Sequence, residues 1–597
     1  MGKQETLGFV LIGLVLIVWM WLQAPPPVEQ RVLPADTLAA TQTKSQDLQQ
    51  EVVEPPKEEP KRATDSLGSY FSHLSSGIEK VLIIKTDLYT AEVTTRGGLL
   101  RKWELSAYET WDGYPVQMVD PELQGDLSLV FLSTDGREIN TRSLYFSADF
   151  ENRKEVQLPG TQSYTVTLVL QVSPTQRIVK KLTFRNGSYA CEAAFELENM
   201  SAVIANFEYH VTWETGVRYA EHNSIDESGF AMAYAYAGGE LAEVDATAFD
   251  ETAKQDINGV TSWIAARNKY FAVALVPTEG SSQGAYIEGR RAQRPDGGAK
   301  EEYRLGLKMP FKGMRTEGCD VTVFLGPLDF DVVKSYGKDL DKIISLGAAW
   351  IIRPISEYVM IPLFQLIHFF IPNYGVVIIV FSVIIKIVLH PLSKSSMKSM
   401  KRMQALQPMM NEIREKHKDD PQKMNQQVMN LYKEYGVNPA AGCLPLLLQM
   451  PILFALYSMF QSSIALRQAN FVGWIRDLSV PDVAFKLPFS LPLIGITDIS
   501  GLAFAMGITM FVQQKMTITD PRQKAMVWMM PVMMTLIFNG LPAGLNLYYF
   551  IFNVLSIAQQ MWLKKTQPEE PLRKVERKKG AGGFLAKIAK EMPNLKK

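Results

Sequence analysis

The chain has 597 residues, which is too long for one hydrophobic core and indicates several domains. Its 62 basic residues balance 62 acidic ones, so net charge by itself points to no polyanionic or polycationic partner. The three cysteines form no C-x-x-C motif and no cysteine–histidine ligand spacing, which leaves zinc-site and thioredoxin-type chemistry without support. Cys191 and Cys319 could pair or stay free, and Cys443 falls in an apolar run.

The N-terminal part predicts an anchor followed by a linker. Residues 7–22 are apolar, and three prolines (25–27) follow them where a signal peptidase would need small residues, so we expect residues 1–24 to form an uncleaved signal anchor. Residues 25–80 are rich in Pro, Glu, Gln, Lys, Thr and Ser. This composition buries too little apolar area to offset chain entropy and predicts a disordered linker.

Residues 81–330 alternate between apolar and polar positions. In 164–172 (YTVTLVLQV) the apolar side chains fall on one face, 178–184 repeats the pattern, and Asn186-Gly187 supplies a hairpin turn. Repeated strands and turns over this length predict a large antiparallel β-sandwich.

No catalytic grouping stands out in this β region. Glu192, Glu196 and Glu198 have the spacing of a solvated strand face, which we favour over paired-carboxylate chemistry. His210 and His222 are interpreted as ordinary surface histidines rather than metal ligands.

The chain becomes helical and apolar after the β region. In residues 331–372, Arg353, Pro354, Pro362 and Pro372 interrupt apolar and aromatic stretches, which suits helices lying in the membrane interface. Residues 374–392 then form a run long enough to cross a bilayer.

Lys386 is the one full charge in that run. Ser382 lies four residues before it and His390 four after it, so the three form a polar stripe on one helix face. An ionisable group inside a span costs roughly 2.5–3.5 kcal/mol on insertion scales, which makes a functional site the default hypothesis. The alternative is a lysine that extends to the nearby interface.

Residues 393–439 predict a polar helical hairpin. Pro408 and the Asp419-Asp420-Pro421 turn divide it into two helices. A methionine-rich stripe recurs at helical spacing, for which we favour a hairpin seam over a soft surface for apolar clients: Met397, Met400, Met403, Leu406 and Met410.

Four further apolar runs follow, at about residues 441–463, 491–513, 525–541 and 545–563. With the anchor and 374–392 they make six predicted spans. Basic residues crowd the hairpin and the tail 564–597, so the positive-inside rule predicts cytoplasmic termini and hairpin and a β domain on the outer side.

Several of these runs carry polar residues. Gln449 and Gln461 lie in one run, Tyr549 and Asn553 lie in another, and Asp498 is a weaker candidate. Lone amides usually bond neighbouring helices, but together with Lys386 they favour a hydrated cavity open to the cytoplasm. Such a groove offers partners to the polar flank of an inserting segment, and Lys386 would attract its acidic residues.

Three stretches in this order resemble the YidC/Oxa/Alb family of membrane protein insertases. They are residues 382–400 (SVIIKIVLHPLSKSSMKSM), 435–457 (YGVNPAAGCLPLLLQMPILFALY) and 541–553 (LPAGLNLYYFIFN). Residues 85–98 (KTDLYTAEVTTRGG) resemble the periplasmic domain of the Gram-negative form more weakly.

The resemblance implies a polytopic α-helical inner-membrane protein with six transmembrane helices, five of them the core (373–563), and a periplasmic β-sandwich. It implies insertion of nascent membrane proteins alone or with the Sec translocon, without nucleotide hydrolysis, cofactor or DNA. The basic tail and hairpin resemble ribosome-docking regions, although their charge equally suits the lipid bilayer. The family's groove and client contacts correspond by position to Lys386, Ser382 and Tyr549.

One position departs from the family pattern. The functional cation of the first core span is usually arginine, and Lys386 stands there. Lysine keeps the positive charge but not the bidentate geometry, and it can lose its proton when desolvated.

Two other functions fit less well. A small-solute transporter predicts a repeat that the sequence does not show. A periplasmic binding scaffold with mere anchors leaves the intramembrane polar residues unexplained.

Overall fold

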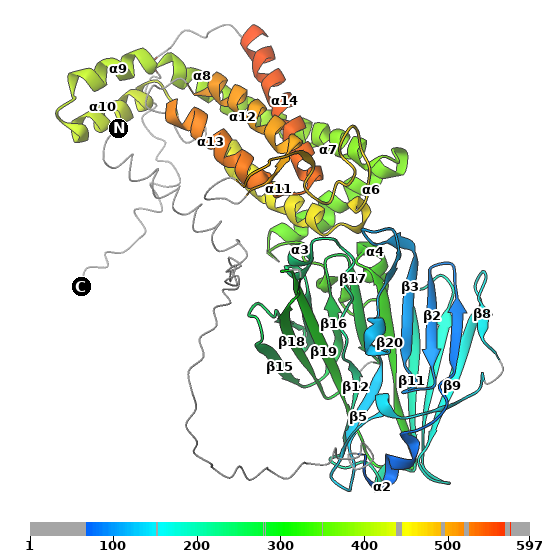
Figure 1. Ribbon diagram of the computed structural model, residues 1–597. Helices are drawn as coiled ribbons and strands as arrows, with labels where there is room; N and C mark the ends of the chain where they lie inside the picture. The colour runs from blue at the N-terminus through cyan, green and yellow to red at the C-terminus, as the bar shows by residue number, and fades with distance from the viewer. Residues whose placement is uncertain are drawn as a thin grey trace, which may run out of the picture. The chain divides into compact units, whose positions relative to one another are not determined.

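The computed structural model describes residues 67–150, 153–278, 280, 282–295, 297–348, 350–437, 444–490, 496–518, 524–566 and 574. The predicted signal anchor, residues 25–66 of the predicted linker, most of the predicted tail, and Cys443 lie outside the described residues. The prediction of a disordered linker is wrong for residues 67–80, which include α2 (Gly68–Phe71) and a 3-10 turn (Ser72–Leu74) and bury Phe71 fully. The chain divides between Ile344 and Ser345 into two compact units, a β unit and a helical unit (Figure 1).

The described part of the β unit contains three sheets, whose strands pair antiparallel except for β1 with β8. The five-stranded sheet has the order β4-β3-β2-β1-β8 and comprises β1 (Val81–Lys85), β2 (Tyr89–Thr94), β3 (Leu100–Glu109), β4 (Pro115–Gln117) and β8 (Glu155–Gln157). The six-stranded sheet has the order β15-β18-β19-β12-β5-β6 and comprises β5 (Ser128–Leu132), β6 (Glu138–Asn140), β12 (Glu208–Trp213), β15 (Thr252–Asn258), β18 (Gly284–Gln293) and β19 (Ala299–Pro310).

The nine-stranded sheet has the order β14-β13-β16-β17-β20-β11-β10-β9-β7. It comprises β7 (Ser147–Ala148), β9 (Ser163–Gln171), β10 (Arg177–Arg185), β11 (Ala190–Glu198), β13 (Met232–Ala237), β14 (Glu240–Val244), β16 (Thr261–Arg267), β17 (Phe271–Pro277) and β20 (Thr316–Pro327). Its strands β13 and β16 contact β18 and β19 of the six-stranded sheet, so the two sheets form the layers of a sandwich. The prediction of a large, mainly antiparallel β domain is confirmed.

Local sequence explains these strands. Val166, Leu168 and Leu170 of β9 are buried while the residues between them are partly exposed, as the alternating pattern predicts. The β10–β11 hairpin turns at Asn186-Gly187, where Gly187 has a φ of +79° that a residue with a side chain rarely adopts.

The cysteines and the glutamate row of the β unit are structural. Cys191 and Cys319 are buried free thiols on β11 and β20, and the register places them opposite Val323 and Phe195, so they do not pair. The glutamates form cross-strand ion pairs of 2.5–3.3 Å, which agrees with a solvated face: Glu192–Arg185, Glu196–Lys181 and Glu198–Arg177. His210 bonds Glu208 at 2.7 Å and His222 is exposed, so both are ordinary surface histidines.

The chain from Phe330 to Phe370 is helical in pieces. α4 (Phe330–Ser335), the 3-10 turn Leu340–Ile343 and α5 (Ile352–Ile355) are followed by a π-helical turn (Ser356–Met360) and α6 (Ile361–Phe370). Pro354 lies in α5 and Pro362 in the first turn of α6, with the π-helical turn between them, so the segment is divided into short helical pieces near both prolines. The location of these pieces in the membrane interface stays a prediction.

The helical unit contains eight α-helices from Tyr374 onward in its described part. They are α7 (Tyr374–Val388), α8 (His390–Ala405), α9 (Gln407–Lys416), α10 (Pro421–Glu434), α11 (Leu444–Gln461), α12 (Gly501–Thr517), α13 (Lys524–Phe538) and α14 (Ala543–Thr566). Among the described residues, no one helix combines the length and the apolar composition that a bilayer crossing needs. Tyr374–Val388 and Ser393–Ala405 reach that standard together, across a bend of 64°.

Two predicted elements differ in the structure. α12 begins at Gly501 rather than at residue 491, and Asp498 lies in β22 (Asp498–Ser500), which pairs with β21 (Val483–Lys486). The predicted two-helix hairpin contains three helices, because Pro408 starts α9 as a separate helix.

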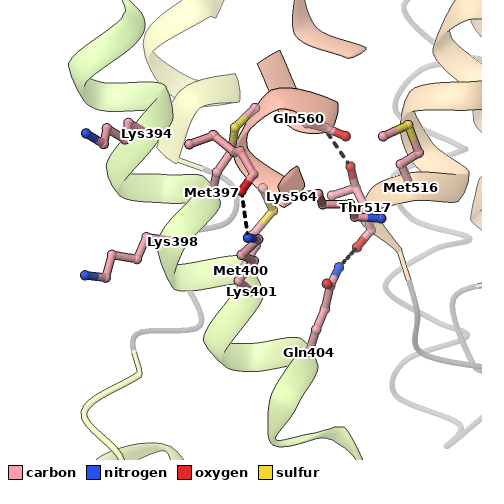
Figure 2. A pocket seen from close by; sticks show the side chains of 11 residues that line it. Lys394, Met397, Lys398, Met400, Lys401, Gln404, Met516, Thr517, Gln560 and Lys564 are labelled. Atoms are coloured by element: carbon pink, nitrogen blue, oxygen red, sulfur yellow. Dashed lines mark hydrogen bonds between the residues drawn. The ribbon is translucent and has the colours of Figure 1, made fainter. Parts of the chain in front are cut away.

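The methionine stripe also divides. Met403, Leu406 and Met410 join a small core with Leu431 and Val437, which confirms a hairpin seam for this part. Met397 and Met400 instead line a hollow beside α12 and α14 (Figure 2).

A buried carboxylate positions the start of α12. Asp482, 4% exposed, accepts from Trp474 Nε1 at 2.9 Å, Leu502 N at 2.8 Å and Ser500 Oγ at 2.5 Å. Ser500 caps the helix by accepting from Ala503 N at 3.0 Å. Asn546 of α14 donates to Ser500 Oγ at 3.4 Å and to Phe538 O at 3.1 Å, so one polar cluster joins the ends of α12, α13 and α14.

Candidate functional site

Polar side chains from the end of α7 and the start of α8 contact α14. Lys386 Nζ of α7 donates to Ser556 Oγ at 2.6 Å, and Nδ1 of His390, the first residue of α8, lies 3.0 Å from Gln559 Nε2. Ser382 is fully buried and donates to Ile378 O at 2.7 Å, one turn earlier in its own helix. The predicted stripe is therefore divided between two helices, each of which is hydrogen-bonded to α14.

The ammonium of Lys386 has few partners in the protein. Ser556 Oγ donates its own proton to Phe552 O at 2.7 Å, so it can only accept from Lys386. The Phe552 ring lies below the cation, with its centroid 4.3 Å from Nζ. An ammonium has three donors, and no carboxylate within the described part of the chain pairs with this one.

A hollow of about 280 Å³ opens beside this pair. Its walls combine polar and apolar side chains from the end of α7, the start of α8 and α14: Val383, Lys386, Ile387, His390, Pro391, Leu555 and Gln559. The arrangement offers one cation, one imidazole and one amide along an apolar wall.

The polar face of α14 is buried and only partly satisfied. Tyr549 and Asn553 are 8% and 6% exposed. Tyr549 Oη, Asn553 Nδ2 and Gln559 Oε1 have no hydrogen-bond partner among the described residues. Because an unpaired buried polar atom costs about 1–3 kcal/mol, this face is suited to water or to polar groups of a bound segment.

The structure brings only some of the predicted site residues together. Lys386 and His390 share the hollow, and Ser382 lies one turn before Lys386. Gln449 and Gln461 lie half-buried on α11, and no hydrogen bond within the described part joins either of them to Lys386. Tyr549 and Asn553 lie on the helix that holds Lys386, without bonding it.

Sequence reasoning missed Phe552, Ser556 and Gln559. The signal was present, because the stripe of Tyr549 and Asn553 continues at helical spacing through Ser556 and Gln559. No group of three or more metal-ligating side chains occurs in the described residues.

A partly buried lysine without a carboxylate partner in the described part of the chain, beside a hollow with polar and apolar walls, is suited to binding a segment that carries both kinds of group. Comparison with known proteins specifies the class. Residues 366–570 match the family model described as 60Kd inner membrane protein, and residues 82–357 match the YidC periplasmic domain. The membrane protein insertase YidC of Chlorobaculum parvum is 38% identical over 96% of both chains, and that of Prosthecochloris aestuarii is 39% identical over the same shares.

The chain belongs to the YidC family of membrane protein insertases. The resemblance stated from the sequence motifs is thereby confirmed, and membership of this family agrees with the expectation that the chain is not an enzyme. It is a bacterial inner-membrane protein with a periplasmic domain. A crystal structure titled as an active YidC insertase with the first transmembrane domain resolved matches 82% of this chain and 96% of that one, at 18% identity and a TM-score of 0.34.

Proposed function

We propose that the chain moves hydrophobic segments of nascent inner-membrane proteins into the bilayer through the hollow beside Lys386. The supporting observation is the ammonium of Lys386, which has one hydroxyl acceptor and one aromatic ring for three donors. A carboxylate in the polar flank of a client is the natural partner for the remaining donors.

The hollow would lower the free-energy barrier to membrane insertion, because its polar side chains replace the water around the polar flank of the client. His390 of α8 and Gln559 of α14 supply hydrogen-bonding groups in the wall of the hollow, and Tyr549 and Asn553 add polar atoms further along α14. The apolar wall, which includes Val383 and Leu555, accepts the hydrophobic part of the client. No nucleotide or cofactor is needed for such a transfer, because burial of the client's apolar surface in lipid drives it.

The wider arrangement belongs to the same proposal. Six spans, cytoplasmic termini and a cytoplasmic hairpin are supported by the apolar runs and by the basic residues of 393–439 and 564–597. Nascent chains, the ribosome at the basic tail and hairpin, and the Sec translocon are the proposed partners. Gln449 and Gln461 are proposed as further groove contacts on α11.

The experiment that tests this function is insertion into liposomes of a single-spanning client with a short acidic tail. Lys386→Ala should lower insertion roughly ten- to hundred-fold, as expected for a charged hydrogen bond worth about 1.5–3 kcal/mol. Lys386→Arg should retain activity, and Lys515→Ala, at an exposed lysine of α12, should match wild type. Equal insertion by Lys386→Ala and wild type would refute the role of the charge, and loss in Lys386→Arg would show that lysine chemistry is required.

Ser556 provides a finer probe of the same site. Ser556→Ala removes the acceptor that holds Lys386 and should lower insertion by less than Lys386→Ala does. Ser556→Thr keeps a hydroxyl and should restore most of the activity. A client whose tail has no acidic residue should be insensitive to both changes, whereas sensitivity of that client would indicate a structural role for Ser556.

A further inference from the structure

The β3–β4 hairpin of the β unit ends in two exposed aromatic side chains. Trp111 and Tyr114 are 58% and 69% exposed, and Asp112 and Gly113 between them are exposed as well. We propose that this tip, residues 110–114, docks on the outer-leaflet surface of the inner membrane, with both rings at the level of the lipid headgroups. The proposal goes beyond insertion itself, because it assigns a membrane contact to the periplasmic domain.

Hydrogen bonds hold the tip in one conformation. Thr110 N donates to Tyr114 O at 2.6 Å, and Tyr114 N donates to Thr110 Oγ1 at 3.2 Å. Trp111 N donates to Ala220 O at 3.3 Å, and the indole ring forms a T-shaped contact with the imidazole of His222, with centroids 4.6 Å apart. An ordered loop therefore presents the two rings to solvent, and its docking costs less conformational entropy than the docking of a flexible loop would.

The tip lies at the end of the β unit from which the chain leaves for the helical unit. Arg218 O, two positions before the acceptor of Trp111 N, accepts from Asn268 Nδ2 at 3.0 Å. Arg267, next to Asn268 in the chain, donates from Nη1 to Ile343 O at 3.0 Å, one residue before the β unit ends. These hydrogen bonds connect the tip to the exit of the chain.

The short connection to the helical unit keeps this end of the β unit close to the bilayer. α5 begins at Ile352, eight positions after Ile344, and belongs to the segment that we predict to lie in the membrane interface. At the length of an extended residue, this connection spans at most about 30 Å. The tip is therefore within reach of the outer surface of the bilayer that the helical unit occupies.

Tryptophan and tyrosine are the side chains best suited to lipid headgroups. Their rings bury apolar area while Nε1 or Oη stays hydrated, which is why these residues are concentrated at membrane–water interfaces. The exposed Glu109 and Asp112 stand beside the two rings, so the apolar area of the tip is divided, unlike the continuous core of a stable protein interface. Because these neighbours are acidic, docking should depend on the rings and not on attraction to anionic lipid.

The test places a spin label at Asp112→Cys in the full chain, reconstituted in phosphatidylcholine liposomes in a Cys443→Ser background. The two other native thiols are buried and should not react. The label should collide more often with oxygen, which partitions into lipid, than with a water-soluble nickel chelate. The matched control is Phe207→Cys, which replaces a 76% exposed aromatic residue at the opposite end of β12 from Arg218. Its label should collide mainly with the nickel chelate.

A second variant tests the two rings themselves. Adding Trp111→Ala/Tyr114→Ala should shift the label at position 112 to the accessibility of the control, while fluorescence of the buried tryptophans verifies the fold. Sodium chloride at about 0.5 M screens exposed charges and should leave the wild-type tip docked.

Four results would overturn the proposal. They are a label at position 112 as accessible to the nickel chelate as the control, an unchanged label in the double variant, release of the tip by salt, and exclusion of both reagents, which would indicate a protein partner. The measurement requires no client, so it succeeds or fails independently of the insertion assay on Lys386.

Discussion

Glu301 is a buried acid of the β unit whose raised pKa should be detectable in the pH dependence of stability. It is 4% exposed and accepts from Ser228 Oγ at 2.5 Å and from Tyr303 Oη at 2.6 Å, with Arg291 Nε 3.8 Å away. Burial raises the pKa of Glu301 from 4.5 to about 7, and the hydrogen bonds and Arg291 only partly oppose this rise. The folded state therefore holds a proton that the unfolded chain releases.

The raised pKa predicts the direction of a stability change with pH. The contribution of Glu301 favours the folded state fully below about pH 4.5 and is lost as the pH rises to about 7. Asp126, whose pKa burial raises to about 6, acts in the same direction at lower pH, and Lys180, whose pKa burial lowers to about 7, acts oppositely above pH 7. Between pH 6 and 7 the urea concentration at the unfolding midpoint of the β unit should fall as the pH rises. We expect this fall to be smaller in Glu301→Gln than in wild type.

The matched control is Glu240→Gln, at an exposed position of β14. It should keep the wild-type pH dependence, which tryptophan fluorescence can follow because Trp103, Trp213 and Trp263 are fully buried in this unit. An unchanged slope in Glu301→Gln would show that this carboxylate is ionised in the folded state throughout the range.

At the scale of the element, polar contacts position two helices that the spacing of their apolar residues alone would not place. α7 contacts α14 through Lys386–Ser556, the start of α8 contacts it through His390–Gln559, and α12 begins where Asp482 accepts from three donors. Polar contacts of this kind have defined geometry, so they select one arrangement among several apolar packings of similar energy.

The Asp482 cluster provides the prediction at this scale. Asp482→Ala leaves the donors of Trp474, Ser500 and Leu502 without their acceptor, at roughly 1–3 kcal/mol for each buried donor. We expect a clear fall in the melting temperature of the detergent-solubilised protein. Asp498→Ala, which removes a 4.0 Å pair between partly exposed side chains, should cost less than about 1 kcal/mol. Equal effects of the two changes would contradict the assignment of Asp482 as the organising residue.

At the scale of the whole molecule, the hollow beside Lys386 is lined by the helical unit. The residues that line the hollow beside Lys386 come from α7, α8 and α14, which all lie in the helical unit, and none comes from the described part of the β unit. Removing residues 81–326 is therefore expected to spare insertion of the short acidic-tailed client. The measurement is insertion in cells or liposomes at matched protein levels.

The control for this deletion is the same shortened chain with Lys386→Ala. It should fail as Lys386→Ala does in the full chain, which shows that the shortened protein still uses the hollow. Loss of insertion by the shortened chain at wild-type abundance would instead assign the β unit a direct part in transfer.

The spacing of apolar and polar residues was enough to predict many strands and helix faces of this protein from its sequence alone. Alternation over 164–172 and 178–184 predicted strands whose buried faces the structure shows. Spacing also predicted one polar helix face for Ser382, Lys386 and His390, of which Ser382 and Lys386 lie on α7 and His390 begins α8. Both patterns depend on neighbours within a few residues. The family motifs of 382–400, 435–457 and 541–553 pointed to the insertase class for the same reason, because each is contiguous in the chain.

The tertiary structure decided what depends on residues far apart in the chain. Lys386 and Ser556 are 170 positions apart, and nothing local to α7 indicates which helix accepts its cation. Strand register keeps Cys191 and Cys319 from pairing, and β21 holds Asp498 in a strand where hydropathy had predicted a helix. The methionine stripe divides between the hairpin core and the hollow that Met397 and Met400 line, because α12 and α14 cover only its first part. The sequence pattern indicates which face of a helix or strand is apolar. Only the tertiary packing shows which other element that face contacts.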